Sequence, residues 1–261
     1  MGVLNVTPDS FSDGGKFLNP ENAIEQAKRL VQEGAAIVDV GGESTRPGAR
    51  PVSADEELAR VSPVLEALPA LPVSIDTSKA AVARRALELG AEMVNDVTAL
   101  CADPQLATVV AEHDAYLCLM HMQGDPRTMQ LAPRYDDVVS EVTTFLQERL
   151  EHAVVQGIRE ERICLDPGIG FGKTVEQNLE LVRRLDVLAE LGRPILLGFS
   201  RKRSLGQILG DPSATTGSVP ASMGAAVAAF EHGAWMLRVH DVRETVEALA
   251  IAAAVEAGAG S

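Results

Sequence analysis

The stretch that decides the fold reads ICLDPGIGFGK at residues 163–173. Its apolar start has the length and composition of a short strand, and it delivers a carboxylate, Asp166, directly into a glycine-rich turn. Pro167 fixes the backbone after that acid, and Thr174 opens a segment with polar helix-start signals. A strand that ends in an acid before a helix is how a barrel enzyme presents a polar group at its catalytic face.

Two other interpretations of this stretch are open. Asp166 stands before Pro-Gly, where an acid often serves only as a turn or cap residue. Residues 167–174 also approach the phosphate-loop pattern G-x-x-x-x-G-K-[ST]. The first position of that pattern is Pro167 rather than glycine, so it fails where the turn needs a free φ, and we set a nucleotide loop aside.

The order of an apolar run and then a helical segment recurs eight times along the chain. Near-continuous apolar runs are typical of strands covered on both faces, and their alternation with helices indicates right-handed crossovers and a parallel sheet. Eight units predict an α/β fold that closes into a single (β/α)8 TIM barrel. An open doubly wound sheet is the alternative, but a G-x-G-x-x-G turn does not follow the first run.

The predicted elements have the following ranges. The strands are expected at 1–6, 35–40, 73–75, 92–94, 115–120, 163–165, 194–197 and 235–239. The helices are expected at 20–33, 54–68, 80–89, 104–112, 135–156, 175–188, 202–209, 218–231 and 242–255.

Size and charge limit what this chain can be. It has 261 residues, 46% of them hydrophobic and 23% charged, which suits one barrel with a large core. We expect one domain over residues 1–256 and a frayed tail at 257–261. The net charge of −14 argues against a partner that is a nucleic acid or an anionic membrane, since both need a basic face.

The cysteines point to a reducing compartment. Cys101, Cys118 and Cys164 are odd in number and widely spaced, which favours buried thiols over a disulfide framework. The sequence also has neither a signal-peptide pattern at its start nor an uninterrupted apolar run long enough to span a membrane. We therefore expect a cytoplasmic protein.

Polar side chains stand at the carboxyl ends of the predicted strands. Each of them alone could be a cap, but in a barrel these ends surround one site, and a full set predicts an active site there. The set comprises Asn5, Glu43, Asp76, Asn95, Asp96, His121, Asp166, Ser200, Arg201, Lys202, Arg238 and His240.

Spacing within this set suggests what the site would bind. Arg238 and His240 are two apart, so they face one side of a strand and would suit a phosphate or carboxylate as a cationic pair. A histidine satisfied in a turn and an arginine on the surface are the alternative. Asp76, Asn95 and Asp166 would supply acceptors and an amide to a flat ring with several N–H donors, such as a 2-amino-4-oxo heterocycle. The role of Asp39, which lies inside its strand, is left open.

Two polar loops follow the first two strands. They span residues 7–19 and 42–54, and the second carries Arg46. Long polar loops at this face of a barrel can fold over a substrate, so we expect both to be mobile lids.

Beyond these patterns, the chain resembles the dihydropteroate synthase family, the pterin-binding barrels of folate biosynthesis. The resemblance extends over nearly the whole chain and is specific as an ordered combination, although no single piece is. It is carried by NVTPDSFSDGG at 5–15, DVGGESTRPG at 39–48, SIDT at 74–77, NDV at 95–97, LMHMQGDPRTMQ at 119–130, LDPGIGFGK at 165–173, GFSRKR at 198–203 and RVHDV at 238–242.

The resemblance implies the reaction and the residues that serve it. In that family p-aminobenzoate is joined to 6-hydroxymethyl-7,8-dihydropterin diphosphate, which gives 7,8-dihydropteroate and diphosphate. The implied pterin-binding residues are Asp76, Asn95, Met120, Asp166, Phe171 and Lys202. The implied diphosphate-binding residues are Asn5, acting with Mg²⁺, and Arg238 and His240. The aminobenzoate site would involve Thr45, Arg46 and Ser200.

The implied chemistry needs no nucleophilic side chain. Mg²⁺, Arg238 and His240 would offset the charge of the departing diphosphate, while Asp76 and Asp166 would favour positive charge on the pterin. With Lys202 these four residues form the expected catalytic set. The arylamine is itself a nucleophile, and GFSRK at 198–202 is not a G-x-S-x-G elbow.

Two alternatives and two further expectations accompany the resemblance. A methyltetrahydrofolate-corrinoid methyltransferase would share the pterin carboxylates and lack the diphosphate apparatus. A non-catalytic pterin-binding paralogue would have lost some of the polar set, and all of that set is present. The family is usually dimeric, so a homodimer is expected. The family also has residues before the first strand, whereas this chain begins at Met1 within it.

Overall fold

The structure, a computed structural model, describes residues 1–7, 20–44, 49–68, 71–124 and 128–258. The predictions for the loop at 7–19, the centre of the loop at 42–54 and the end of the tail at 257–261 fall outside these ranges. The predicted roles of Thr45 and Arg46 lie outside the described residues as well.

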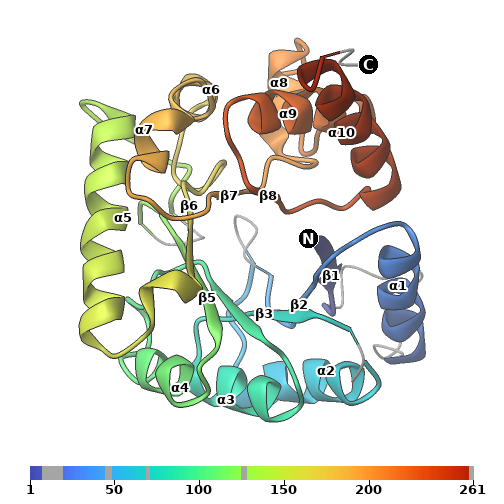
Figure 1. Ribbon diagram of the computed structural model, residues 1–261, viewed down its shortest axis with the longest axis vertical. Helices are drawn as coiled ribbons and strands as arrows, with labels where there is room; N and C mark the ends of the chain where they lie inside the picture. The colour runs from blue at the N-terminus through green and yellow to red at the C-terminus, as the bar shows by residue number, and fades with distance from the viewer. Residues whose placement is uncertain (8–19, 45–48, 69–70, 125–127, 259–261) are drawn as a thin grey trace.

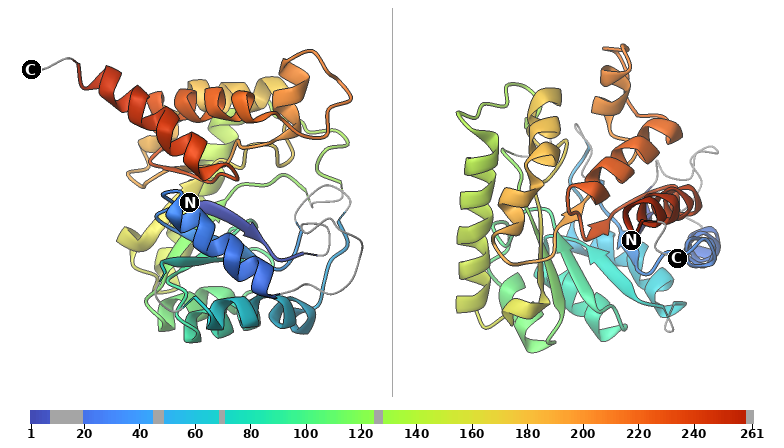
Figure 2. Two further views of the ribbon diagram at one scale, coloured as in Figure 1. Left: turned by 90° about the vertical axis from the view of Figure 1, so that its right-hand side faces the viewer. Right: turned by 45° about the horizontal axis from the view of Figure 1, so that its top comes forward.

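Eight parallel strands form the inner layer of the described chain, and helices surround them on the outside (Figures 1 and 2). The first six pair in chain order in one sheet, and the last two pair with each other. The bounds are β1 Gly2–Asn5, β2 Val38–Gly41, β3 Val73–Asp76, β4 Met93–Asp96, β5 Tyr116–Met120, β6 Ile163–Asp166, β7 Leu196–Leu197 and β8 Met236–Leu237.

Two seams join these sheets into a closed barrel. At the first seam a single parallel bridge links Leu165 of β6 to Ile195, just before β7. At the second seam a single bridge links Gly2 of β1 to Val239, just after β8, and the backbone N–H of Val3 donates to the Val239 carbonyl at 2.9 Å. The predicted (β/α)8 barrel is confirmed, and the open doubly wound sheet is excluded.

The helices of the described residues follow the strands in the predicted order. Their bounds are α1 Pro20–Gln32, α2 Ala54–Glu66, α3 Ala80–Glu88, α4 Leu106–Glu112, α5 Val138–Val155, α6 Val175–Arg183, α7 Leu185–Ala189, α8 Arg203–Ile208, α9 Val219–Glu231 and α10 Val242–Glu256, with a short 3₁₀ turn at Glu160–Arg162. Among these helices, none has both the length and the apolar character needed to traverse a lipid bilayer.

Local chemistry explains where two helices differ from the expected ranges. The helix predicted from Tyr135 begins at Val138 because the Asp137 carboxylate accepts the N–H groups of Val139 and Ser140 at 3.0 Å, which makes Asp137 the N-cap. The segment predicted as one helix over 175–188 is two helices, since Arg184 has φ −113° and ψ 36° and interrupts the helical backbone.

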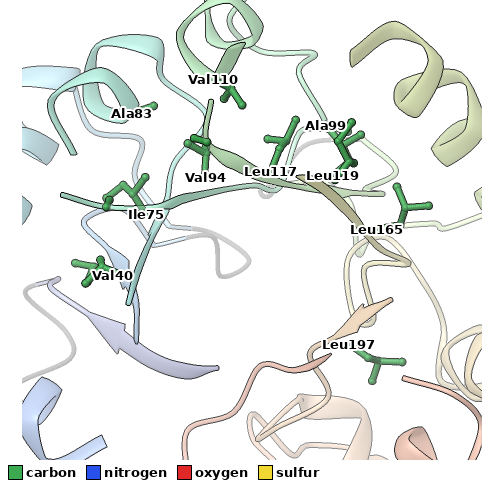
Figure 3. Close-up of a cluster of buried hydrophobic side chains, with 14 of the residues drawn as sticks. Val40, Ile75, Ala83, Val94, Ala99, Val110, Leu117, Leu119, Leu165 and Leu197 are labelled. Atoms are coloured by element: carbon green, nitrogen blue, oxygen red, sulfur yellow. The ribbon is translucent and has the colours of Figure 1, made fainter. Parts of the chain in front are cut away.

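Side chains of alternate strand residues divide the core into two parts. Outward-facing side chains such as Val40, Ile75, Val94, Leu117, Leu165 and Leu197 point toward the helices and are buried there (Figure 3). A separate cluster of sulfur-containing and aliphatic side chains comes from alternate positions of the strands: Met93, Cys118, Cys164 and Leu196, with Met1 and Met236 packed against them. Because strand side chains alternate between faces, the barrel interior at the strand ends is left to the polar residues.

Candidate active site

Three neighbouring strands place acceptor groups side by side inside the carboxyl end of the barrel. Asp39 lies on β2, Asp76 ends β3, and Asn95 lies on β4, where it pairs in register with Asp76. All three residues are buried, and Asp39 is 0% exposed. Burial of carboxylates is costly unless they meet a cation or hydrogen-bond donors, so a partner is required here.

That partner is Arg238, which follows β8 on the opposite side of the second seam. Its Nε donates to Oδ2 of Asp39 at 2.6 Å, and its Nη2 donates to Oδ2 of Asp76 at 2.8 Å. Burial works against the guanidinium charge, but the carboxylates of Asp39 and Asp76 outweigh it and raise the pKa of Arg238. One arginine therefore holds two acids together and ties β8 to β2 and β3.

Asp76 remains poised near neutral pH despite this cation. Burial raises the pKa of Asp76 to about 7; Arg238 opposes that rise, while the nearby Asp39 and Glu57 add to it. A carboxyl group with a pKa near the working pH is a common mark of a functional site. The oxygen Oδ1 of Asp39 is buried without a protein partner among the described residues.

Asp39 also orients the side-chain amide of Asn95. Its Nδ2 donates to Oδ2 of Asp39 at 3.1 Å, so its carbonyl oxygen is directed away from Asp39. The amide therefore adds an acceptor to the site, next to Asp76.

Asp166, at the end of β6, forms the next wall of the site. Its Oδ1 accepts the backbone N–H of Gly168 at 2.7 Å, and the side chain is 5% exposed. Burial raises the pKa of Asp166 to about 6, against the hydrogen bond from Gly168 and the charges of Lys202, Lys173 and Arg238. The acid is thus mostly ionised at neutral pH and becomes protonated in mild acid.

The glycine-rich turn after Asp166 needs its glycines. Gly168, Gly170 and Gly172 all have positive φ, at 69°, 80° and 66°. A Cβ on Gly168 would lie 1.9 Å from the carbonyl oxygen of His121, so the turn packs directly against the end of β5. The N–H groups of Gly168 and Gly170 donate to Asp166 and Asn178, which supports setting aside a phosphate loop.

An aromatic ring and a cation complete this side. The ammonium of Lys202 lies 4.2 Å from the centre of the Phe171 ring, a cation–π distance. Phe171 clusters with Met120, Met129 and Val97, so the predicted ring-binding residues Met120 and Phe171 are in one apolar group. Met120 is also the register partner of Asp166.

Ser200 and His240 form a pair between the loops after β7 and β8. The Ser200 Oγ lies 3.1 Å from Nδ1 of His240 and accepts the backbone N–H of His240 at 3.2 Å. Burial, with Arg238, Arg201 and Lys202 nearby, lowers the pKa of His240 to about 3. His240 is therefore a neutral imidazole here, and the expected cationic pair consists of one charged arginine and one hydrogen-bonding histidine.

Asn5 ends β1 beside these groups. A Cβ on Gly41 would lie 3.7 Å from Oδ1 of Asn5 and 3.6 Å from Oδ2 of Asp76, so the two side chains flank the same glycine. Within the described ranges no three His, Cys, Asp or Glu side chains are grouped as metal ligands. An amide oxygen at this position fits Mg²⁺ only as one ligand among several, because that ion commonly takes most of its ligands from water and substrate phosphate.

Four of the predicted strand-end residues have protein partners that hold neighbouring segments together. Asp96 accepts the N–H of Leu100 at 2.6 Å and so holds the turn after β4. Arg201 pairs with Asp241, with its Nε 2.9 Å from Oδ2. Glu43 accepts from Lys79, and the ring nitrogen of His121 is 2.9 Å from the ammonium of Lys173.

We refer to Asp39, Asp76, Asn95, Asp166, Ser200, Lys202, Arg238 and His240 as the polar cluster. It combines carboxylate and amide acceptors on β2, β3, β4 and β6 with cations and a hydroxyl–imidazole pair from β7 and β8. An acceptor-rich wall facing a cation is suited to a ligand that has N–H donors at one end and an anionic group at the other.

Comparison with known proteins agrees with this chemistry. Residues 1–240 match the family of pterin binding enzymes. The dihydropteroate synthase of Synechocystis sp. is 46% identical over 260 residues, which cover 98% of this chain and 89% of that protein. The chain belongs to the dihydropteroate synthase family.

Solved structures of this family share the fold. The Yersinia pestis enzyme, in a sulfonamide drug complex, has a TM-score of 0.92 and 45% identity, covering 98% of this chain and 94% of that one. The Xanthomonas albilineans enzyme with 4-aminobenzoic acid has a TM-score of 0.89 and 48% identity, covering 98% and 92%. The same enzyme with 7,8-dihydropteroate has a TM-score of 0.85 and 44% identity, with the same coverage. Dihydropteroate synthases are transferases, so this chain is an enzyme.

Two residues of this family member were not assigned from sequence. Asp39 lies two residues before Gly41, which places both on the same, inward face of β2. Lys173 ends both the phosphate-loop pattern and the motif at 165–173, and neither pattern indicates that it is 3% exposed and in contact with His121. The signal for Lys173 was a lysine that follows three alternating glycines, but its burial depends on β5 and could not be read from the turn alone.

Proposed function

We propose that this chain joins p-aminobenzoate to 6-hydroxymethyl-7,8-dihydropterin diphosphate and releases 7,8-dihydropteroate and diphosphate. The observation that carries the proposal is the bridge from Arg238 to Asp39 and Asp76, which puts a cation directly beside acceptors for a pterin. The Xanthomonas albilineans relative, solved with 4-aminobenzoic acid and with 7,8-dihydropteroate, supports the choice of substrates.

The pterin would lie along the acceptors. Its 2-amino and ring N–H groups are donors, and the acceptors are Asp76 on β3, the carbonyl oxygen of Asn95 on β4 and Asp166 on β6. Lys202 would serve the 4-oxo group, and the ring would lie against Phe171 and Met120. Ionised Asp76 and Asp166 would also favour positive charge that develops on the dihydropterin.

The diphosphate would meet Arg238 and His240. A guanidinium has five N–H donors, so the hydrogen bonds of Arg238 to two carboxylates leave donors for a phosphate oxygen. If the Ser200 hydroxyl donates to Nδ1 of His240, the imidazole proton is on Nε2, where it can donate to the same group. Mg²⁺ would be held by Asn5 on the protein side and would offset the charge of the leaving group.

The reaction requires one bond to break and one to form. The methylene carbon of the pterin loses its C–O bond, whose electron pair leaves with diphosphate, and the amine nitrogen of p-aminobenzoate forms the new C–N bond and releases a proton. The residues named above bind, orient and balance charge, and none of them is a nucleophile. We place Ser200 beside the aminobenzoate, together with Thr45 and Arg46, which lie outside the described residues.

We further propose a homodimer through the outer face of α10. This helix exposes Ile251 at 69% and Val255 at 75%, and their spacing of four residues puts both on one face. Exposed apolar side chains along one helix favour burial against another surface. Ile251→Glu should shift the mass measured by light scattering toward the monomer, whereas Glu148→Gln, an exposed change on α5, should not; identical masses for both variants would argue against this interface.

We place the protein in the cytoplasm. Its cysteines are free in the structure, with Cys118 and Cys164 buried and Cys101 exposed, as suits a reducing compartment.

A turnover assay tests the proposed reaction. Purified protein with Mg²⁺ and both substrates should give 7,8-dihydropteroate, detected by chromatography, with diphosphate released in equal amount. Asp166→Asn should lower kcat/KM for the pterin diphosphate by about 10- to 1000-fold, since a charged acceptor is lost. Asp186→Asn, on the exposed side of α7, is the matched control and should match the wild type.

Two results would overturn the proposal. One is the absence of dihydropteroate at every Mg²⁺ concentration. The other is methyl transfer from methyltetrahydrofolate to a corrinoid in place of the condensation.

A further inference from the structure

Lys173, the last residue of the glycine-rich turn, has a buried side chain that the proposed reaction does not use. It is 3% exposed. Its Nζ lies 2.9 Å from Nδ1 of His121 and 3.0 Å from the carbonyl oxygens of both Gly168 and Phe171. A fourth oxygen, the carbonyl of His121, is 3.4 Å away.

These acceptors call for the charged form of the lysine. An ammonium has three N–H donors, and His121, Gly168 and Phe171 accept one each. Burial, reinforced by the charge of Lys173, lowers the pKa of His121 to about 3, so its Nδ1 is a neutral acceptor. None of the hydrogen-bonding partners is a carboxylate, and a buried cation without one needs compensation from a nearby negative charge.

Asp166 supplies that negative charge through an electrostatic interaction with Lys173. Burial lowers the pKa of Lys173 to about 7, Asp166 opposes the change, and Lys202 adds to it. In return, Lys173 is one of three cations, with Lys202 and Arg238, that favour the ionised form of Asp166. The two buried groups thus stabilise each other's charge.

Lys173 also connects the glycine-rich turn to the end of β5. Its ammonium joins the end of β5 at His121 to both ends of the segment from Gly168 to Phe171. Gly168 donates to Asp166, and Phe171 lies under Lys202. A shift of the turn would therefore move an acid and an aromatic ring of the polar cluster together.

A direct contact of Lys173 with a phosphate does not fit these observations. Its donors are directed to backbone and ring acceptors on the inner side of the turn, and the side chain is almost inaccessible. A role through the turn and through Asp166 remains.

We propose that Lys173 is a positioning residue for pterin binding, which pins the glycine-rich turn to β5 and adds, with Lys202 and Arg238, to the positive charge around Asp166. The inference rests on the proposed function, because Asp166 is taken as an acceptor of pterin N–H groups. The inference has a geometric part, which Lys173 shares with other anchors of the turn, and a charge part, which the uncharged anchors of the turn lack.

The chain offers a matched anchor without charge. Tyr135 donates from its hydroxyl to the carbonyl of Gly172 at 2.9 Å, so Tyr135→Phe loosens the same turn and changes no ionised group. Lys173→Met removes the charge at similar length, and Lys173→Arg retains it. Lys173→Gln is a milder neutral change, since its amide can still donate to the carbonyls of Gly168 and Phe171.

The experiment measures the affinity of each variant for 6-hydroxymethylpterin by fluorescence between pH 5 and pH 9. Wild-type affinity should fall in two overlapping steps, as Asp76 with a pKa of about 7 and then Asp166 with a pKa of about 6 become protonated. In Lys173→Met, or in Lys173→Gln if the methionine variant does not fold, the midpoint of the Asp166 step should rise by about one pH unit. A lower affinity should remain at pH 9, because the turn is no longer pinned to β5. Tyr135→Phe should lower affinity at every pH with an unchanged midpoint, and Lys173→Arg should keep the wild-type midpoint.

The outcomes separate this inference from the proposed function. A neutral Lys173 variant with the wild-type midpoint would overturn the charge role while the wild type still forms dihydropteroate. Equal affinity of wild type, Lys173→Gln and Tyr135→Phe would overturn the positioning role altogether. Failure of the wild type to bind the pterin or form product would instead count against the proposed function.

Discussion

Asn95 donates its amide N–H to Asp39 at 3.1 Å, and this single hydrogen bond decides which end of the amide the site presents. Asp39 lies on β2 and Asn95 on β4, with Ser74 and Asp76 of β3 between them. The buried acid thus acts on a ligand through its neighbours, because Asp39 also holds Nε of Arg238.

Changing Asp39 to asparagine should weaken pterin binding without unfolding the protein. The neutral amide would lose its charge-assisted hydrogen bonds to Asn95 and Arg238, so the orientation of both is released. Affinity for 6-hydroxymethylpterin, measured by calorimetry, should fall about 10- to 100-fold. Asp55→Asn, an exposed change on α2, is the control; equal affinity in the two variants would contradict the role given to Asp39.

The stability of Asp166→Asn relative to the wild type should increase as the pH rises. Burial raises the pKa of Asp166 from 3.8 to about 6, so between these values the unfolded chain releases a proton that the folded chain keeps. Stability is therefore lost as the pH rises through this window, and the loss persists above it. Asparagine does not titrate and avoids the loss.

Urea unfolding of both proteins at pH 4 and pH 7.5 measures this effect. The unfolding free energy of the variant minus that of the wild type should be about 1–3 kcal/mol larger at pH 7.5 than at pH 4. A difference in unfolding free energy that is the same at both pH values would show that Asp166 does not have a raised pKa.

Lys79→Met should destabilise the protein by about 3 kcal/mol. Its ammonium lies 2.6 Å from Oε2 of Glu57, whose side chain is 0% exposed, and the substitution leaves this acid buried without its cation. The double variant Lys79→Met/Glu57→Gln should recover more than half of the loss, because the uncompensated charge is gone. Denaturant midpoints measure both, with the exposed Lys28→Met as control; a double variant no more stable than the single one would refute the pairing.

Gly168→Ala should cost more than 3 kcal/mol and abolish turnover. The new Cβ would lie 1.9 Å from the backbone oxygen of His121, which cannot yield like a flexible side chain. Gly192→Ala is the matched control, because Gly192 has nearly the same φ, 71° against 69°, and no atom within 4 Å of its Cβ position. That control should lose only about 1 kcal/mol, the cost of the left-handed backbone. Similar melting temperatures for the two variants would contradict the close packing of Gly168 against the backbone of His121.

Much of this structure could be predicted from local patterns. Apolar runs followed by helical segments indicated eight units, and the glycine after the run at 163–166 marked the turn that positions Asp166. The motifs then identified the family, and in the structure Asp76 pairs in register with Asn95 and accepts a hydrogen bond from Arg238. The carboxyl ends of the strands of a barrel surround one site, so the position of a residue at the end of its strand was sufficient to predict that it lies there.

Contacts between distant segments could not be predicted in this way. Nothing near Arg238 in sequence indicates that two acids 162 and 199 residues away would share its guanidinium. The neutral state of His240 depends on burial and on three cations, two of which, Arg201 and Lys202, come from the loop after β7. Spacing alone therefore suggested a charge that the fold removes. His121 and Arg201 also follow the carboxyl ends of strands, as the site residues do. In the structure, however, His121 contacts Lys173 and Arg201 pairs with Asp241, and both partners come from other elements.

The two seams of the barrel have a consequence for how the enzyme loses activity. The acceptors of the polar cluster stand on the six-stranded side, while Ser200, Lys202, Arg238 and His240 come from the two-stranded side. Single bridges join the sides, so the ion pairs of Arg238 with Asp39 and Asp76 act as a clasp across one of the weakest joints of the described barrel. Any partial opening of the barrel along that joint separates the acids from their cation while the helices are still intact. Inactivation by mild denaturant should accordingly precede the loss of helical signal, and a pterin diphosphate bound to both sides would delay it.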